Sequence, residues 1–294
     1  MSKFPRTTVG HLSVSRMIIG TNWFMGWSHT TAAKDHYIKD KVCNRKAMAD
    51  IIEVFFKAGV DTIMGQIHME PMREAISEAQ DRTGVKAIIV ATPSFPVTAE
   101  TPEKGFDPGE VEKVLAEQEK LGTAICMPHQ STTDAMLDRC TRKLRHMDQI
   151  CAAIRKHGMI PGLSTHMPES VTYADESGLD VDTYIQIYNS MGFLMQVEVD
   201  WVQRIINQAS KPVMTIKPFA AGQVRPLQGL TFVWNSIRPQ DMVTVGTMSP
   251  REAEEVIEMS MAILERCTLN IALQETRSKS SVKPLGKPAN IAAV

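Results

Sequence analysis

Three of the eight histidines follow short apolar runs of the kind that form buried strands. They are His68, His129 and His166, and Glu70 lies two residues after the first of them. Imidazoles that converge from three strand ends could hold zinc, manganese or iron and leave one position open for water or substrate. Glu70 could then be a fourth ligand or a general base. The alternative is a polar pocket that the three histidines share without a metal.

Lys217 is the only charged residue in the apolar run Val213–Phe219. An unpaired ammonium at the end of a buried strand is expensive to desolvate, so such a lysine usually has a chemical role. It could form a Schiff base, act as a base of lowered pKa or bind an anionic substrate. A structural ion pair with a carboxylate such as Glu198 is the other interpretation. We expect catalysis to depend on Lys217, His129 and Glu70.

Three further residues at predicted strand ends could contact a small polar ligand. Asn22 and Asn189 offer side-chain amides, and Trp23 offers a stacking surface. An aromatic ring that only plugs the end of the fold is the alternative for Trp23. The turn Gly246–Arg251 presents backbone N–H groups at a predicted helix N-terminus, and such groups can hold a phosphate.

The elements that position these residues are short apolar runs that alternate with longer amphipathic stretches. Such runs suit parallel strands that are covered on both faces. The eight predicted strands are Met17–Trp23, Val60–Met64, Lys86–Ala91, Thr123–Met127, Ile160–Thr165, Thr183–Tyr188, Val213–Pro218 and Met242–Gly246. Between them, Lys143–His157 shows helical spacing of its apolar residues, and Gly158 is a typical stop.

Eight strand–helix rounds in about 250 residues match the size of a closed barrel. The fold class predicted is therefore α/β, a (β/α)8 TIM barrel over residues 1–267. A doubly wound sheet is disfavoured because no GxGxxG follows the first strand. Residues Met25–Asn44 form a long loop after that strand, and residues 268–294 form a C-terminal tail. In a barrel of this kind, catalytic groups come from the carboxyl ends of several strands.

The composition excludes several classes of protein. The net charge is −1, from 32 basic and 33 acidic side chains, so no nucleic-acid-binding surface is indicated. No apolar run approaches the roughly 20 residues that cross a bilayer, and the first residues lack the pattern of a signal peptide. The five cysteines show no CxxC spacing. We expect a cytoplasmic protein with a small-molecule substrate and with no nucleic-acid or membrane partner. A homo-oligomer is compatible with the sequence.

Several stretches of the chain resemble the aldo-keto reductases. SRMIIGTNWF is similar to the family's first strand, and RKLRHMDQICAAIRKHGMIPGLSTHMPESV resembles its helix before a G-x-S-x-H/N-x-P fifth strand. DTYIQIYNS, TIKPFAAGQV and VTVGTMSPREAEEVI resemble its sixth, seventh and eighth strands. Together these stretches cover most of residues 16–264 in the family's order. The resemblance implies a barrel fold and a nicotinamide cofactor such as NADP.

The family's Asp-Tyr-Lys-His tetrad is matched only in part. His129 corresponds to the family's histidine, and Asp61-Thr62 resembles its Asp-Thr pair. Gln66 stands where the family has the tyrosine, and VATPSFP stands where it has the lysine. The same comparison implies that the cofactor is contacted by Ser164, Gln186, Thr247 and Arg251.

These observations favour a barrel enzyme that acts on a sugar or hydroxy-acid derivative by acid/base chemistry, as a lyase, isomerase or hydrolase, with a divalent metal assisting. The first alternative is an NADP-dependent oxidoreductase that uses His129 together with Tyr37 or another group from the long first loop. The second is a non-catalytic barrel that binds a ligand.

Overall fold

The protein is built around a sheet of nine parallel strands. The structure, a computed structural model, describes residues 3–269 together with residues 271, 279 and 282. The strands follow the order β10-β11-β12-β13-β3-β4-β5-β6-β9. Their bounds are β3 Met17–Gly20, β4 Thr62–Gly65, β5 Ile88–Ala91, β6 Thr123–Cys126, β9 Ile160–Pro161, β10 Leu163–Ser164, β11 Tyr184–Ile187, β12 Val213–Ile216 and β13 Met242–Val245.

The first and last strands in this order, β10 and β9, belong to one continuous segment that Gly162 divides. The backbone N–H of Gly162 donates to Cys126 O at 3.2 Å on one side, and Leu163 N–H donates to Thr183 O at 3.1 Å on the other. The sheet therefore forms a nearly closed barrel of eight strand segments, which confirms the predicted fold class. A Cβ at Gly162 would lie 2.8 Å from Thr183 O, so a side chain at this position would force the backbone to move.

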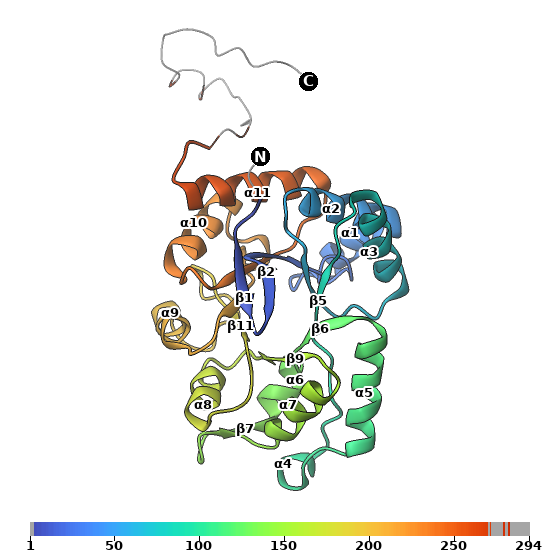
Figure 1. Cartoon of the computed structure of the whole chain (residues 1–294). Coiled ribbons are helices and arrows are strands. Elements are labelled where there is room, and N and C mark those ends of the chain that lie inside the picture. The colour runs from blue at the N-terminus through green and yellow to red at the C-terminus, as the bar shows by residue number, and fades with distance from the viewer. Residues whose placement is uncertain (1–2, 270, 272–278, 280–281, 283–294) are drawn as a thin grey trace.

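Helices surround the barrel on its outer side (Figure 1). The longer ones are α1 Ala32–Val42, α2 Arg45–Lys57, α3 Glu70–Thr83, α5 Pro108–Lys120, α7 Met147–Lys156, α8 Glu169–Ser177, α9 Val199–Gln208, α10 Pro226–Ser236 and α11 Pro250–Glu265. Short helical turns are α4 Thr101–Lys104, α6 Gln130–Thr133, η1 Asp134–Met136 and η2 Ala220–Gly222. Each long helix buries an apolar stripe, as Met48, Ile52 and Phe55 do in α2.

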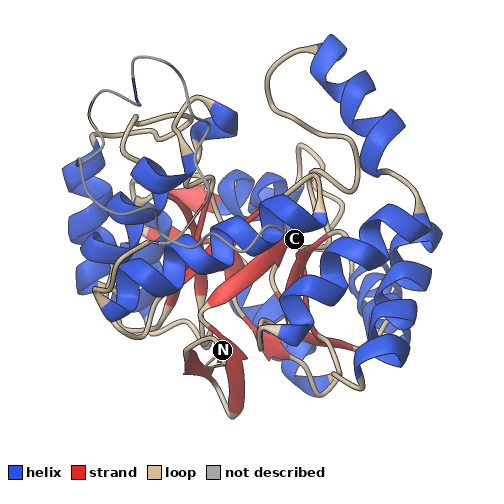
Figure 2. Ribbon diagram, turned by 90° about the horizontal axis from the view of Figure 1, so that it is seen from above, coloured by secondary structure: helices blue, strands red, loops and turns tan. Residues whose placement is uncertain are grey.

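A β-hairpin closes the amino-terminal end of the barrel. It consists of β1 Arg6–Val9 and β2 Leu12–Ser15, which pair antiparallel. Val9 and Val14 are fully buried, and they pack with barrel-interior side chains such as Ile18 and Ile125. Figure 2 shows the hairpin projecting at one end of the barrel. Because its apolar side chains fill this end, the described residues leave room for a ligand at the opposite, carboxyl-terminal end.

Two segments differ from the sequence prediction, and the structure does not test a third. The helix expected over Lys143–His157 begins only at Met147, because Lys143–Leu144 is strand β8, paired with β7 Leu137–Asp138. The expected loop Met25–Asn44 contains helix α1. The expected tail, residues 268–294, lies largely outside the described residues. Within the part that the structure describes, no helix has the length and apolar character needed to span a membrane.

Candidate active site

The main cavity lies at the carboxyl ends of the barrel strands, as expected. It has a volume of about 760 Å³, which is within the usual range for a site that binds a small molecule. Residues just past β3, β4, β6, β10, β12 and β13 line it, so segments far apart in the sequence meet there. The predicted residues that line it are Asn22, Trp23, His129, Ser164, His166, Lys217 and Thr247.

Lys217 reaches into this cavity from the end of β12. Its φ of +61° is unusual for a residue with a Cβ, and the strand ends one residue earlier, at Ile216. No ion pair joins Lys217 to a carboxylate in the described part of the chain. The expected alternative, a structural pair with Glu198, is therefore wrong; Glu198 is the N-cap residue of α9. Burial lowers the pKa of Lys217 to about 8.

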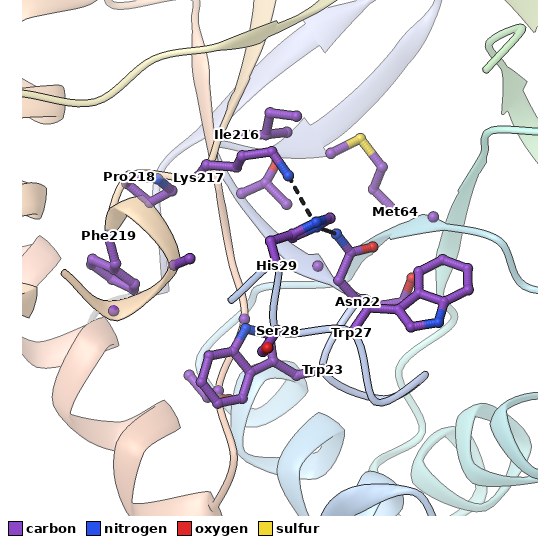
Figure 3. Close-up of a pocket in the computed structure, with 18 of the residues that line it drawn as sticks. Asn22, Trp23, Trp27, Ser28, His29, Met64, Ile216, Lys217, Pro218 and Phe219 are labelled. Atoms are coloured by element: carbon purple, nitrogen blue, oxygen red, sulfur yellow. Dashed lines mark hydrogen bonds between the residues drawn. The ribbon is translucent and has the colours of Figure 1, made fainter. Parts of the chain in front are cut away.

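His29, from the loop after β3, meets Lys217 across the cavity. Lys217 Nζ lies 3.0 Å from His29 Nε2, and the side-chain nitrogen of Asn22 lies 2.8 Å from the same atom (Figure 3). Because the Lys217 ammonium can only donate, His29 Nε2 accepts from it, which places the proton of the neutral ring on Nδ1. Burial and the neighbouring Lys217 lower the pKa of His29, while Asp35 acts in the opposite direction.

His166 stands within electrostatic reach of the other bases in the cavity. Burial first, and then the charges of Lys217, His129 and His29, lower the pKa of His166 to about 4. Its backbone N–H donates to the carboxylate of Asp134 at 3.2 Å. Asp134 thereby fixes the backbone that carries His166, and it leaves the imidazole ring free for a ligand.

His129 begins the short helix α6 and has one ring nitrogen in use. Its Nδ1 accepts from the backbone N–H of Ser131 at 3.3 Å and lies 2.8 Å from the Ser131 hydroxyl. A neutral His129 therefore carries its proton on Nε2, which makes it a hydrogen-bond donor. Burial lowers the pKa of this side chain.

The predicted metal site is not formed by the described residues. His68 and Glu70 are exposed, and neither lines the main cavity. His68 borders a separate recess beside Ser94 and Glu117, because the chain turns away from the barrel axis after β4 ends at Gly65. No group of three or more His, Cys, Asp or Glu side chains in the described ranges could hold a metal ion. The three-histidine metal site, and the role of Glu70 in it, are corrected accordingly.

Asn189 organises a loop and does not line the cavity. Its side-chain oxygen accepts from the backbone N–H groups of Met191 and Phe193 at 3.2 and 2.9 Å, and its nitrogen donates to Phe193 O at 3.1 Å. The side chain is completely buried. The substrate-binding role expected for Asn189 is therefore corrected to a structural one, because its polar atoms are already used.

Glycines next to the cavity make room for side chains of neighbouring strands. A Cβ at Gly65 would meet the hydroxyl oxygen of Thr21, and one at Gly246 would lie 2.7 Å from the Trp23 ring. Three buried threonine hydroxyls on this side of the barrel have no hydrogen-bond partner among the described residues: Thr21, Thr244 and Thr247. A packed interior normally satisfies such groups, so this floor of the cavity is suited to contact with water or a ligand.

Two residues that line the cavity are not singled out by strand or helix periodicity. His29 was placed only in a long loop, although that loop is rich in histidine and tryptophan. Arg225 lines the cavity from the N-terminus of α10 and is exposed, with no ion pair in the described ranges. Their positions depend on where two loops cross the barrel mouth, and strand and helix periodicity does not predict such crossings.

Comparisons with known proteins agree with this geometry at the level of the fold. No protein-family model and no curated protein matches the sequence. Two structures from Pseudomonas aeruginosa, assigned as aldo-keto reductases, are 17% and 18% identical to this chain, each with a TM-score of 0.62. Each alignment covers 88% of this chain, and it covers 95% of the first structure's chain and 94% of the second's. An aldo-keto reductase from Brucella melitensis is 12% identical, with a TM-score of 0.55 over 92% of this chain and 95% of that one. The chain has the aldo-keto reductase fold.

Within this aldo-keto reductase fold, the tetrad implied by the sequence resemblance is not assembled. Of its matched positions, His129 lines the cavity, whereas Asp61 lies at the start of β4 and pairs with Arg6 at 2.9 Å near the closed end. Gln66 and Thr92 line the cavity near the places of the tyrosine and lysine. Neither an amide nor a hydroxyl of this type supplies the proton donor of a carbonyl reduction.

The residues expected to contact a nicotinamide cofactor are divided. Ser164 and Thr247 line the cavity, and Gln186 is buried beside it with its side-chain nitrogen unpartnered among the described residues. Arg251 is exposed and ion-paired with Glu254 and Glu255 at 3.1 and 3.4 Å. Tyr37 is half exposed and does not line the cavity. Of the four expected cofactor contacts, Ser164, Gln186 and Thr247 therefore lie at or beside the cavity, and Arg251 does not line it.

Proposed function

We propose that the protein is a barrel enzyme that moves a proton on a small metabolite with a carbonyl group, such as a sugar or hydroxy-acid derivative. It would act as an isomerase or a lyase. The observation behind the proposal is the contact between Lys217 and His29 in a cavity that also holds His129 and His166. An ammonium beside neutral imidazoles supplies a proton donor and proton acceptors in one site.

The pKa values divide the roles of these side chains. At neutral pH Lys217, whose pKa is about 8, is mainly protonated, and His166, whose pKa is about 4, is neutral. The charged group can therefore stabilise negative charge on a substrate oxygen, and the neutral ring can accept a proton. His129 adds a neutral N–H donor through its Nε2.

A proton-transfer cycle follows from this division. Lys217 Nζ donates a hydrogen bond to the carbonyl oxygen, and His166 accepts the proton from the adjacent carbon. The C–H electron pair then moves into the new carbon–carbon double bond, and the carbonyl oxygen receives the Lys217 proton. Because the Lys217 charge is one cause of the low pKa of His166, loss of that charge makes His166 a stronger base. In an isomerase, His166 returns its proton to the former carbonyl carbon, and the hydroxyl on the adjacent carbon gives its proton to Lys217 as it becomes the new carbonyl, which restores both side chains.

Solvent isotope exchange tests this proposal directly. Small hydroxy-ketones, aldoses and 2-oxo acids would be incubated with the protein in D₂O, and deuterium at the carbon beside the carbonyl would be measured by NMR. We expect exchange with at least one compound, reduced about 100-fold or more in Lys217→Met and in His166→Asn. Lys104→Met, which alters an exposed pair with Glu100, is the matched control and should exchange normally. Exchange that is equal in all three variants would refute the assignment.

A covalent route through Lys217 is the second candidate function. It is favoured by the lowered pKa, because about a tenth of the lysine is the free amine at pH 7. The amine would add to the carbonyl carbon and expel water, which gives an imine. Borohydride would reduce that imine to a stable amine, and mass spectrometry would find the added mass on the peptide that contains Lys217. If no mass is added under conditions where isotope exchange occurs, the non-covalent cycle is the correct one.

A further inference from the structure

The cavity gathers nitrogen bases without gathering their counter-ions. Lys217, His29, His129 and His166 come from the ends of four different strands or the loops after them, and all line one cavity. No carboxylate in the described part of the chain forms an ion pair with any of these four side chains. A partly buried ammonium without a counter-ion is unfavourable in the empty site, so a ligand that supplies negative charge would relieve it.

The carboxylates near the cavity are already engaged. Asp35 accepts from the N–H and hydroxyl of Ser28 at 2.8 and 2.6 Å. Asp134 accepts from the backbone of His166 and from the hydroxyl of Thr165. The other charged groups that line the cavity are Arg225, Glu252 and Glu255. None of these carboxylates is free to move onto Lys217 without leaving its own partner.

The two glutamates at the α11 side illustrate this engagement. Glu252 accepts from the backbone N–H of Met248 at 2.7 Å, one residue before the N-cap Ser249. Glu255 pairs with Arg251 at 3.4 Å. Both carboxylates therefore have partners at the wall of the cavity, and neither is paired with Lys217, the charged member of the base cluster.

We propose that the substrate carries a carboxylate or phosphate group, which binds at Lys217 as its missing counter-ion and displaces the contact with His29. This inference rests on the proposed function, because it names the substrate class of the same site. Arg225, an exposed cation at the cavity wall, adds to the positive potential that an approaching anion meets. The carbonyl group and the anionic group would then belong to one small molecule, such as a 2-oxo acid or a sugar phosphate, and different N–H groups of the Lys217 ammonium would contact the two groups.

Binding of an anion beside Lys217 must be linked to proton uptake. An anion favours the protonated amine, so it raises the pKa of Lys217 from about 8. At pH 8 the empty site holds about half a proton on Lys217, and a bound anion would bring this to nearly one. The imidazoles of His29 and His129, whose pKa values are lowered in the empty cavity, respond in the same direction at lower pH.

Calorimetric titration with simple anions tests the proposal without any turnover. Inorganic phosphate and malonate would be titrated at pH 8 in two buffers of different ionisation enthalpy, with the uncharged diamide of malonate as the matched neutral ligand. We expect an anion to bind with uptake of about half a proton. Lys217→Met should bind it about tenfold more weakly or worse, with no uptake at this pH, and Lys104→Met should match the parent.

The two anions distinguish the sources of negative charge. Tighter binding of phosphate would assign a phosphate ester, and tighter binding of malonate would assign a carboxylate. Equal binding of the neutral diamide, full binding by Lys217→Met, or binding of neither anion would overturn the proposal. Because no reaction is followed, anion binding without isotope exchange would refute the proposed function alone. Exchange only with uncharged carbonyl compounds would refute the anionic substrate alone.

Discussion

The charged groups at the two ends of the barrel differ in whether they have partners of opposite charge. At the amino-terminal end, the buried carboxylate of Asp241 receives N–H donors from Arg238 and from Val213, all at 2.8 to 2.9 Å. The guanidinium of Arg16 donates to Asp241 O at 3.0 Å and lies over the ring of Trp234. At the carboxyl-terminal end, the lysine and the imidazoles have no acidic partner in the described ranges.

The charged groups at the closed end therefore stabilise the fold, and those at the open end are available for function. Charges that are paired and hydrogen-bonded hold the strand ends and the hairpin in place at the closed end. Charges that lack partners at the open end are costly to keep, and they persist in sites where a ligand or a reaction uses them. Substitutions that remove a charge at the two ends should therefore have opposite effects on stability.

The largest effect is expected at the closed end, from Asp241→Ala. The substitution removes a fully buried carboxylate, which leaves the backbone N–H of Val213 without its acceptor and the charge of Arg238 without its counter-ion. We expect a loss of about 3–5 kcal/mol in the free energy of unfolding, measured by urea denaturation. Glu100→Ala, which breaks an exposed pair with Lys104, should lose less than about 1 kcal/mol. A small loss in Asp241→Ala would mean that the closed end is not held by this carboxylate.

An intermediate effect is expected from Gly65→Ala at the open end. Gly65 has a φ of +146°, and an added Cβ would overlap the Thr21 hydroxyl. Strain and overpacking together should destabilise the protein by about 3 kcal/mol. Gly84 is the control, because it also has a positive φ but its Cβ would meet nothing within 4 Å; Gly84→Ala should lose about 1 kcal/mol. Equal losses in the two variants would show that the backbone conformation alone explains the effect.

The smallest effect, and the one of opposite sign, is expected from Lys217→Met. The folded pKa of Lys217, about 8, lies below its usual 10.5, so folding is penalised wherever the unfolded chain keeps this lysine charged. The variant should be more stable than the parent by about 1–3 kcal/mol at pH 7. The difference should shrink as the pH rises from 8 towards 10.5, because the lysine then loses its charge in both states. Stability curves at several pH values measure it, and a variant that is less stable at pH 7 would contradict the argument.

The sequence predicts the scaffold far better than the cavity. The eight apolar runs correspond to the barrel strands because burial on both faces demands apolar residues, whatever the loops do. Lys217, His129 and His166 were placed in the cavity for the same reason, since each directly follows a strand. His68 also follows a strand, but the chain turns away after Gly65, and a strand's end does not fix the direction of the next residues.

The periodicity of apolar residues does not predict where the side chains of loop residues lie. The position of His29 depends on how the loop from Thr21 to Thr31 folds back across the barrel, which brings together residues that lie 188 positions apart in the sequence. Asn189 was misassigned for a related reason, because its side chain bonds with its own loop and such local bonds leave no period in the sequence.

The hairpin at the amino-terminal end has a kinetic consequence for whatever the cavity binds. Val9 and Val14 fill the barrel interior at this end, so in the described chain a ligand reaches the cavity from the carboxyl-terminal end. Substrate and product must then use the same entrance in turn, and neither can enter while the other is bound. A product that dissociates slowly would therefore act as a competitive inhibitor, and its release would limit the rate of turnover.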